Sequence, residues 1–230
     1  MNKHQPLYSK KLAKEWINWV EADNAEGSRE KEVYSLIRKW IKITKPKSVV
    51  DIGCGQGICS KFIDRKIKYI GVDLSRELIK RAKQLYKSLN RKFIVGDVYN
   101  TPLDNNHSDA VFSIWVWSHL ADLKQAAKEM YRILKPGGHF LIITANPETY
   151  KIRKTFYKSF KEYDNYLVGT FDLGKGKTLT NTTLYFHTKK KIREAIKNSK
   201  LIIDKIDTIG LKDTYQGGLN ISITGHKDIS

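Results

Sequence analysis

Short apolar segments alternate with stretches of helical spacing between residues 49 and 144, and no other feature of the sequence constrains the fold as strongly. Strands are predicted at 49–52, 69–73, 93–95, 110–114 and 140–144. Helices are predicted after the glycines of residues 53–57, from 75 to about 89, and from 122 to 134. Strands that alternate with helices of this length predict a parallel sheet with right-handed crossovers and helices on both faces.

The flanking segments extend this core. Residues 10–42 are predicted to form two helical pieces, broken near residues 23–28, and Pro46 ends the second piece. Residues 147–187 are aromatic and basic and predict an insertion; a helix at 189–198 and strands at 201–206 and 219–224 follow, with the last two strands as an antiparallel pair. The predicted fold class is therefore α/β: a Rossmann-like, doubly wound, mostly parallel seven-stranded sheet with an antiparallel edge strand, an N-terminal helical cap and an insertion after strand 5.

Composition excludes several classes of protein. At 230 residues, with 40% hydrophobic and 11% aromatic residues, the chain can bury a core and is too aromatic for a disordered protein. Uncharged stretches such as 110–120 are shorter than the roughly 20 apolar residues of a membrane helix, and the N-terminus has no apolar leader, so we expect a cytoplasmic protein without a membrane partner. Two cysteines five residues apart form neither a disulfide framework nor a paired-cysteine metal site.

The charge balance favours an anionic partner. The chain has 42 basic and 24 acidic residues, a net charge of +18, which is typical of proteins that bind nucleic acid, anionic lipid or phosphorylated small molecules. Residues 151–200 contain 13 Lys or Arg and 4 Asp or Glu, but no compact basic run. A lysine-rich surface that keeps the protein soluble explains the same numbers.

A glycine-rich turn follows the first predicted strand and indicates a nucleotide site. Gly53, Gly55 and Gly57 let the backbone approach a ligand closely, and their spacing differs from the Gly-x-Gly-x-x-Gly fingerprint of dinucleotide sites, which disfavours a nicotinamide-dependent reductase. Asp73 ends the second predicted strand, where a carboxylate can accept both hydroxyls of a ribose. Asp97 follows the third predicted strand, in position to accept from an adenine amino group.

These segments together resemble the class I S-adenosylmethionine-dependent methyltransferases. The matching pieces are Val50-Asp-Ile-Gly-Cys-Gly-Gln-Gly57, Gly71-Val-Asp-Leu-Ser75, Gly96-Asp-Val98, Ser108-Asp-Ala-Val-Phe-Ser-Ile114 and Arg132-Ile-Leu-Lys-Pro-Gly-Gly138, in the family's order. The resemblance implies S-adenosylmethionine as cofactor and S-adenosylhomocysteine as product. It implies a cofactor site of Asp51, Gly53, Cys54, Gly55, Asp73, Leu74, Gly96, Asp97, Val98, Ser113 and Ile114, with Arg29 as a candidate for the methionine carboxylate or as a surface charge.

The same resemblance divides the chain into parts of one methyltransferase domain. Residues 1–45 are the helical cap, 46–146 the cofactor-binding core, 147–187 a substrate-side insertion, and 188–230 the closing helix and strands. Methyl transfer from a sulfonium is an in-line displacement, so the protein mainly aligns the reactants. The acceptor is expected to be an O- or N-nucleophile of a small molecule.

Acceptor-side residues are sought outside the shared motifs. Trp115 and Trp117 follow the fourth predicted strand and would point the same way if that strand extends, although either tryptophan packing on a neighbouring helix is an equal alternative. His119 is a candidate general base or a structural capping residue. Trp19, Tyr150 and Tyr157 are further substrate-side candidates, and with Lys151, Arg153 and Lys154 the insertion predicts a lid over an anionic or aromatic acceptor, or a helix packed on the sheet.

Two other functions compete with a small-molecule methyltransferase. An RNA (tRNA) methyltransferase would use the basic segment 151–200 to follow phosphates. A binding module would keep the fold but regulate a partner, which intact Asp73, Asp97 and glycines disfavour. The segment Ser113-Ile-Trp-Val116 stands where an amino-methylating DNA enzyme has Asn-Pro-Pro-Tyr or Asp-Pro-Pro-Tyr, which counts against DNA adenine as acceptor.

Overall fold

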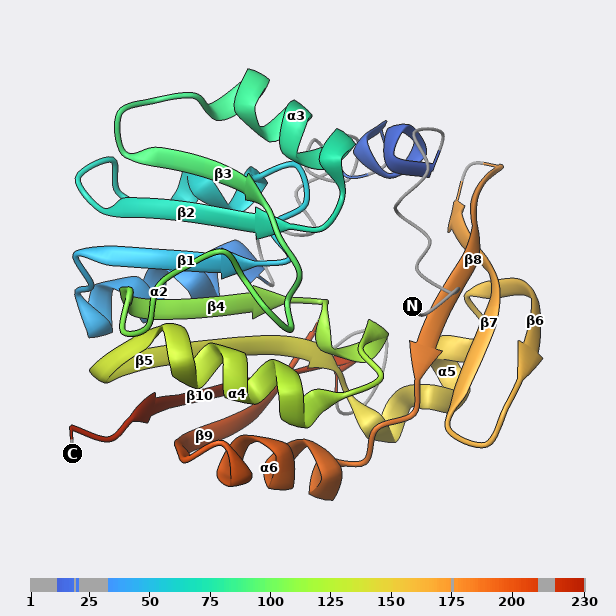
Figure 1. The fold of residues 1–230 in the computed structure, drawn as a ribbon. Coiled ribbons are helices and arrows are strands. Elements are labelled where there is room, and N and C mark those ends of the chain that lie inside the picture. The colour runs from blue at the N-terminus through green and yellow to red at the C-terminus, as the bar shows by residue number, and fades with distance from the viewer. Residues whose placement is uncertain (1–11, 19, 21–32, 175, 211–217, 230) are drawn as a thin grey trace.

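A computed structural model describes residues 12–18, 20, 33–174, 176–210 and 218–229. Its centre is a seven-stranded sheet in the order β3-β2-β1-β4-β5-β10-β9 (Figure 1). The strands are β1 (Ser48–Ile52), β2 (Lys68–Asp73), β3 (Arg91–Val95), β4 (Ser108–Ile114), β5 (Leu134–Ala145), β9 (Leu201–Ile209) and β10 (Asn220–Lys227). The first five strands pair in parallel, and β10 enters antiparallel between β5 and β9. The predicted fold class and the antiparallel pair at one edge of the sheet are confirmed.

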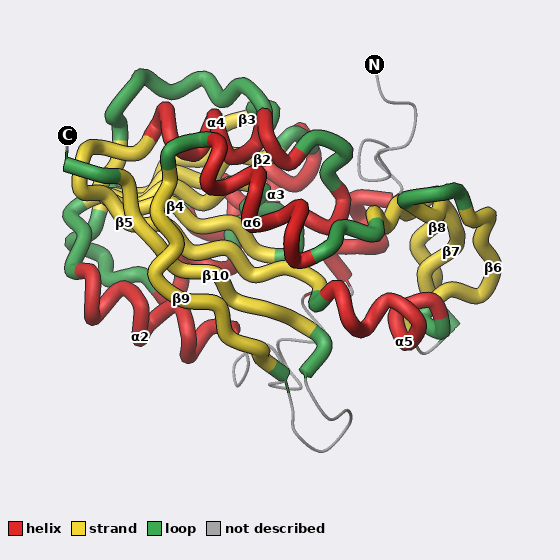
Figure 2. The backbone as a smooth tube through the Cα atoms, turned by 90° about the horizontal axis from the view of Figure 1, so that it is seen from below, coloured by secondary structure: helices red, strands yellow, loops and turns green. Residues whose placement is uncertain are grey.

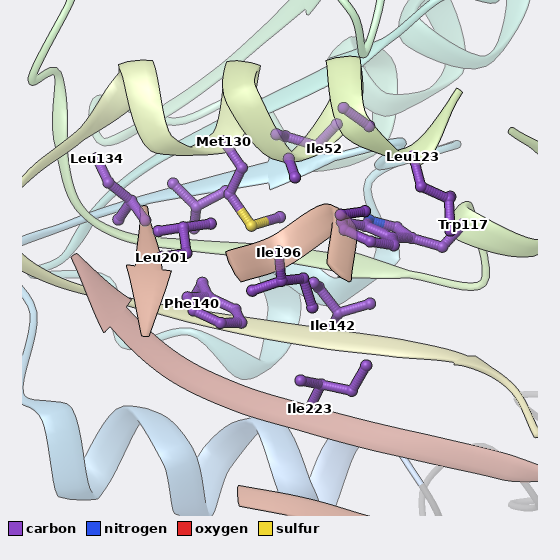
Figure 3. Packing of buried hydrophobic residues seen from close by; sticks show 14 of the residues in the cluster. Ile52, Trp117, Leu123, Met130, Leu134, Phe140, Ile142, Ile196, Leu201 and Ile223 are labelled. Carbon is purple, nitrogen blue, oxygen red and sulfur yellow. The ribbon is translucent and has the colours of Figure 1, made fainter. Parts of the chain in front are cut away.

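Helices cover both faces of this sheet. On one face, α2 (Ser35–Thr44) and α3 (Arg76–Tyr86) bury Ile37 and Ile79 against the sheet. On the other face, α4 (Leu123–Ile133) and α6 (Lys189–Asn198) contribute Met130 and Ile196 to a second core (Figures 2 and 3). Asp122 caps α4 as predicted, because its carboxylate accepts from two backbone amides of the first turn. No helix in the described ranges is both long and apolar enough to cross a membrane.

Helix α2 is the second piece of the predicted N-terminal helical segment. It ends at Thr44 because Lys45 takes a left-handed conformation at φ 45° and its amide bonds the Ile41 carbonyl at 2.9 Å. Residues 12–18 of the first piece are also helical. The break predicted at 23–28 lies outside the described residues, as do Trp19 and Arg29.

Three local predictions were wrong. The segment after the glycines forms only a short 3-10 helix, η3 (Ile58–Phe62). Gly53, Gly55 and Gly57 all have positive φ and form the turn after β1, which leaves only this short segment for a helix before β2. Helix α3 ends at Tyr86, so Leu89 is fully exposed instead of extending the apolar stripe. Strand β5 begins at Leu134, because Leu134 already pairs with Ser108 ahead of the Pro-Gly-Gly sequence expected to precede the strand.

The segment predicted as an insertion forms mainly a second sheet. After η5 (Pro147–Thr149) and α5 (Tyr150–Lys154), three strands pair antiparallel in the order β6-β7-β8: β6 (Tyr157–Glu162), β7 (Tyr166–Gly174) and β8 (Lys177–Tyr185). This small sheet stands beyond the carboxyl ends of β1, β2 and β4 (Figure 1). It therefore faces the edge where ligands bind in open parallel sheets.

Candidate active site

The glycine turn after β1 is fixed by backbone hydrogen bonds to β2. The amides of Gly53 and Cys54 both donate to the Val72 carbonyl, at 2.7 and 3.0 Å, and the Gly55 amide donates to Asp73 Oδ2 at 2.8 Å. A Cβ atom on Gly53 would lie 2.2 Å from Val116 Cγ2. Glycine is therefore required where the turn passes the segment after β4.

Asp73 ends β2 and is held by backbone amides on both of its oxygens. Its Oδ1 accepts from the Ser75 amide at 2.9 Å, while Oδ2 accepts from Gly55. Burial raises the pKa of Asp73, and the amides of Ser75, Gly55 and Leu74 partly oppose that rise. The carboxylate thus has a fixed orientation at the carboxyl end of its strand.

Asp51 lies deeper in the same cluster. It is buried in β1, and the Tyr69 hydroxyl donates to its Oδ2 at 2.6 Å. Burial raises the pKa of Asp51 to about 7, the Tyr69 hydrogen bond lowers it, and the nearby Asp73 charge adds to the rise. Cys54 is buried beside them as a free thiol, and burial raises its pKa.

The turn after β3 brings Gly96, Asp97 and Val98 to the same edge. The Gly96 amide donates to the Asp73 carbonyl at 3.0 Å, which joins this turn directly to β2. Asp97 Oδ1 accepts from the Tyr99 amide at 2.9 Å, and Val98 packs against the core of α4. The ends of three adjacent strands thus carry the three carboxylates that were predicted from separate segments, Asp51, Asp73 and Asp97.

Strand β4 ends at Ile114, and the two tryptophans after it separate. Trp115 takes a left-handed conformation at φ 58°, which ends the strand, and its side chain packs on the α2 face of the sheet. Trp117 is 1% exposed and lies in the core under α4 (Figure 3). The strand does not extend past Ile114, so the condition under which both tryptophans would point the same way is not met. Trp117 follows the alternative of packing on a neighbouring helix, and as a core residue it presents no surface to an acceptor.

His119 joins the main sheet to the small one. It ends η4 (Trp117–His119), and its Nδ1 is hydrogen bonded to the Thr183 carbonyl of β8. Because a carbonyl only accepts, Nδ1 carries the proton and Nε2 is the basic nitrogen of the neutral ring. Burial lowers the pKa of His119, and the positive charge of Arg153 lowers it further.

Of the two tyrosines predicted on the acceptor side, Tyr150 begins α5 and Tyr157 begins β6 of the small sheet. Tyr150 donates to the His187 carbonyl at 3.0 Å, and burial raises its pKa to about 12. Tyr157 is 8% exposed, and burial also raises its pKa. Arg153 and Asn220 share this region, since Arg153 Nη2 donates to Asn220 Oδ1 at 2.8 Å. Asn220 was not anticipated, and Arg153 was noticed only as one of several basic residues, because their contact joins segments 67 residues apart.

Comparison with known proteins identifies the core. A family model for methyltransferase domains matches residues 50–142, from β1 into β5. The chain carries a methyltransferase domain. A solved S-adenosylmethionine-dependent methyltransferase from Clostridium acetobutylicum has the same fold, with a TM-score of 0.66 at 17% identity over 86% of this chain and 92% of that one. The match over residues 50–142 and the shared fold are consistent with the predicted class I methyltransferase, and S-adenosylmethionine is the methyl donor of such enzymes.

Two plant relatives extend the comparison of the methyltransferase domain. The chain is 37% identical over 106 residues to the chloroplastic tocopherol O-methyltransferase of Arabidopsis thaliana, covering 44% of this chain and 30% of that protein. It is 27% identical over 201 residues to the chloroplastic 2-phytyl-1,4-beta-naphthoquinone methyltransferase of the same plant, covering 81% of this chain and 70% of that protein. The chain thus spans less than a third of the length of the first of these relatives.

The residues of the methyltransferase domain fit its cofactor. Two side-chain oxygens at the ligand edge are buried without a hydrogen-bond partner in the described structure, Gln56 Oε1 in the glycine turn and Ser113 Oγ at the end of β4. Buried polar atoms normally find partners, so this pair is suited to the polar amino acid end of a ligand. Asp73 and Asp97 present carboxylate oxygens at the same edge, and Gly53 leaves no room for a side chain in the turn.

Proposed function

We propose that the chain transfers a methyl group from S-adenosylmethionine to an O- or N-nucleophile of a small-molecule acceptor. One observation supports this most strongly: the 2.8 Å hydrogen bond from the Gly55 amide to Asp73. It locks the ribose-binding carboxylate of β2 to the glycine turn of β1, and a nucleoside ligand needs both in a fixed relation.

The cofactor-binding role of each predicted residue is part of this proposal. Asp73 would bind the ribose, Asp97 and Val98 the adenine, and the backbone of Ser113 and Ile114 the amino acid end. Gly53, Cys54, Gly55, Leu74 and Gly96 would supply backbone and packing surface around them. Asp51 would steady the glycine turn through Tyr69, whose hydroxyl it already binds.

Bound S-adenosylmethionine supplies the activated methyl group, so the protein's own contribution is alignment of the acceptor and exclusion of water. The small sheet of β6–β8 stands over the ligand edge and is suited to cover it. His119, neutral at pH 7 because its pKa is lowered, would take the acceptor's proton at Nε2. Trp115, Tyr150 and Tyr157 would form the wall around the acceptor.

A small molecule is favoured over RNA by two observations. The plant relatives act on tocopherol and a naphthoquinone by name, both small aromatic compounds. Several lysines of residues 151–200 are paired with acids, as in Lys154 with Glu162, Lys158 with Asp172 and Lys189 with Glu148, which reduces the charge left for phosphates.

We also propose a cytoplasmic location and one domain over residues 1–230.

Two experiments test the proposed function. Thermal-shift measurements with S-adenosylmethionine, S-adenosylhomocysteine and nicotinamide cofactors should show stabilisation by the first two alone. A screen with radiolabelled methyl donor against metabolite extract and total RNA should place the label in the metabolite fraction. Stabilisation by a nicotinamide cofactor alone would contradict the cofactor assignment, and label in RNA alone would contradict the acceptor class.

A further inference from the structure

Arg153 in α5 is a shielded cation without an acidic partner among the described residues. Its Nη2 donates to the Leu219 carbonyl and to Asn220 Oδ1, both neutral acceptors. Its Nε is buried and has no hydrogen-bond partner in the part of the chain that the structure describes. Burial lowers the pKa of Arg153, and no carboxylate of the described ranges opposes that shift. An arginine held in this way is costly unless an anion completes the pair.

Each of the two oxygens that accept a hydrogen bond from Arg153 also accepts one from another donor. The Leu219 carbonyl also accepts from the Asn146 amide at 2.9 Å, and Asn220 Oδ1 also accepts from Trp115 Nε1 at 3.1 Å. Removing the guanidinium would therefore leave neither oxygen without a donor. Satisfying these two oxygens therefore does not by itself account for a partly buried arginine at this position.

The position of Arg153 relates it to the acceptor side of the site. Asn220 Oδ1 accepts hydrogen bonds from both Trp115 Nε1 and Arg153 Nη2, so this one oxygen links the guanidinium to Trp115, the residue that follows β4. Arg153 also lies close enough to His119, Tyr150 and Tyr157 for its charge to lower the pKa of each. The charge is thus placed among the proposed general base and the aromatic wall.

We propose that Arg153 binds an oxyanion, a carboxylate or phosphate, carried by the methyl acceptor. This rests on the proposed function, because it assigns the acceptor side of the same site. The planar guanidinium fork matches carboxylate and phosphate oxygens, and its Nε is a donor still unpaired among the described residues. The acceptor is then an anionic small molecule, whose nucleophile lies near His119.

Calorimetric titration of the protein saturated with S-adenosylhomocysteine tests this inference. The probes are benzoate, phenyl phosphate and benzamide, which share an aromatic ring and differ in the charge of the headgroup. We expect at least one anion to bind about tenfold or more tightly than benzamide, as a charge-assisted pair implies. Arg153→Gln should remove that preference. Arg193→Gln, the same change on the exposed face of α6, should keep it.

The remaining outcomes are distinguishable. Binding of benzoate alone or of phenyl phosphate alone identifies the headgroup. If neither anion binds the wild type better than benzamide, the inference fails, and this comparison does not require a folded variant. Anion binding retained by Arg153→Gln overturns it as well. If Arg153→Gln weakens S-adenosylhomocysteine instead, Arg153 serves the cofactor carboxylate and the inference is wrong. Failure of the wild type to bind S-adenosylhomocysteine would refute the proposed function itself.

Discussion

Asp73, the last residue of β2, accepts a 2.8 Å hydrogen bond from the amide of Gly55 in the turn after β1. The two residues are 18 positions apart in the chain, and the parallel pairing of β1 with β2 brings them together. Burial raises the pKa of this carboxyl group, and the hydrogen bond from the Gly55 amide acts in the opposite direction. A ribose bound there would meet an acceptor whose orientation is already fixed.

Replacing Asp73 by Ala should sharply weaken cofactor binding. Two hydroxyl hydrogen bonds to a charged acceptor would be lost, so we expect the dissociation constant of S-adenosylhomocysteine to rise by about tenfold or more in calorimetric titration. Asp64→Ala, at an exposed carboxylate that bonds only its own loop, is the control. Unchanged affinity in a folded Asp73→Ala protein would refute the ribose assignment.

Asp51 should make the free energy of unfolding fall as pH rises. The pKa of Asp51 is about 7 in the folded protein and near the ordinary aspartate value of 3.8 in the unfolded chain, so between these pH values only the unfolded state has released the proton. The stabilisation that the Asp51 carboxyl group contributes is fully present below about pH 4 and is lost as the pH rises through about 7. Urea denaturation should therefore show that Asp51→Asn, which cannot ionise, gains a few kcal/mol on the wild type over this range.

The comparison of the wild type with Asp51→Asn isolates the titration of Asp51. His119, His187 and the other titrating groups are present in both, so their contributions cancel in the difference between the two free energies. A difference that stays constant with pH would show that Asp51 does not titrate in this range. Tyr69→Phe, which removes the hydroxyl that donates to Asp51, should raise the pKa of Asp51 and extend the loss of stability to higher pH.

The sequence predicted the parts of the fold that depend on local periodicity. Buried strands, capped helices and the glycine turn are readable because each places apolar or turn residues at fixed spacing, and Ser75 and Asp122 cap their helices as such residues should. The small sheet was missed because its strands do not alternate. In β6 only Tyr157 is buried, and the following five residues are exposed.

The sequence predicted the site residues that lie at strand ends, but it did not predict contacts between segments that are far apart in the chain. Asp73 and Asp97 could be placed because parallel strands bring their carboxyl ends to one edge. The sequence could not decide between the two alternatives for Trp117, because no local signal predicts the left-handed conformation of Trp115, after which the two side chains lie in the cores on opposite faces of the sheet. The contact of Arg153 with Asn220 depends on β10 pairing with β5, which is known only from the structure.

Trp117→Ala should therefore affect stability and not acceptor recognition. Its side chain is fully buried under α4, so removal should cost about 3–5 kcal/mol in the free energy of unfolding measured with urea. Leu89→Ala, at a fully exposed side chain, should change stability little. Equal stability of the two variants would place Trp117 outside the core.

His119→Asn should separate a catalytic role from a capping one. The asparagine amide can still donate to the Thr183 carbonyl, but the variant lacks the basic Nε2. With an acceptor found by the radiolabel screen, we expect methyl transfer at saturating donor to slow by about a hundredfold or more, with thermal stability and S-adenosylhomocysteine affinity kept. An unchanged rate would leave His119 as the residue that ties η4 to β8.

Neutralising the exposed lysines of β6 should leave methyl transfer unaffected. Lys158 and Lys161 point from the small sheet into solvent, and Lys158 lies 3.7 Å from Asp172, so neither is expected to hold a nucleic-acid phosphate. We expect Lys158→Gln combined with Lys161→Gln to keep the rate of label transfer into metabolite extract and the weak retention of total RNA on filters. RNA binding that falls steeply with salt in the wild type and weakens in this variant would instead support an RNA acceptor, because released counterions report phosphate contacts.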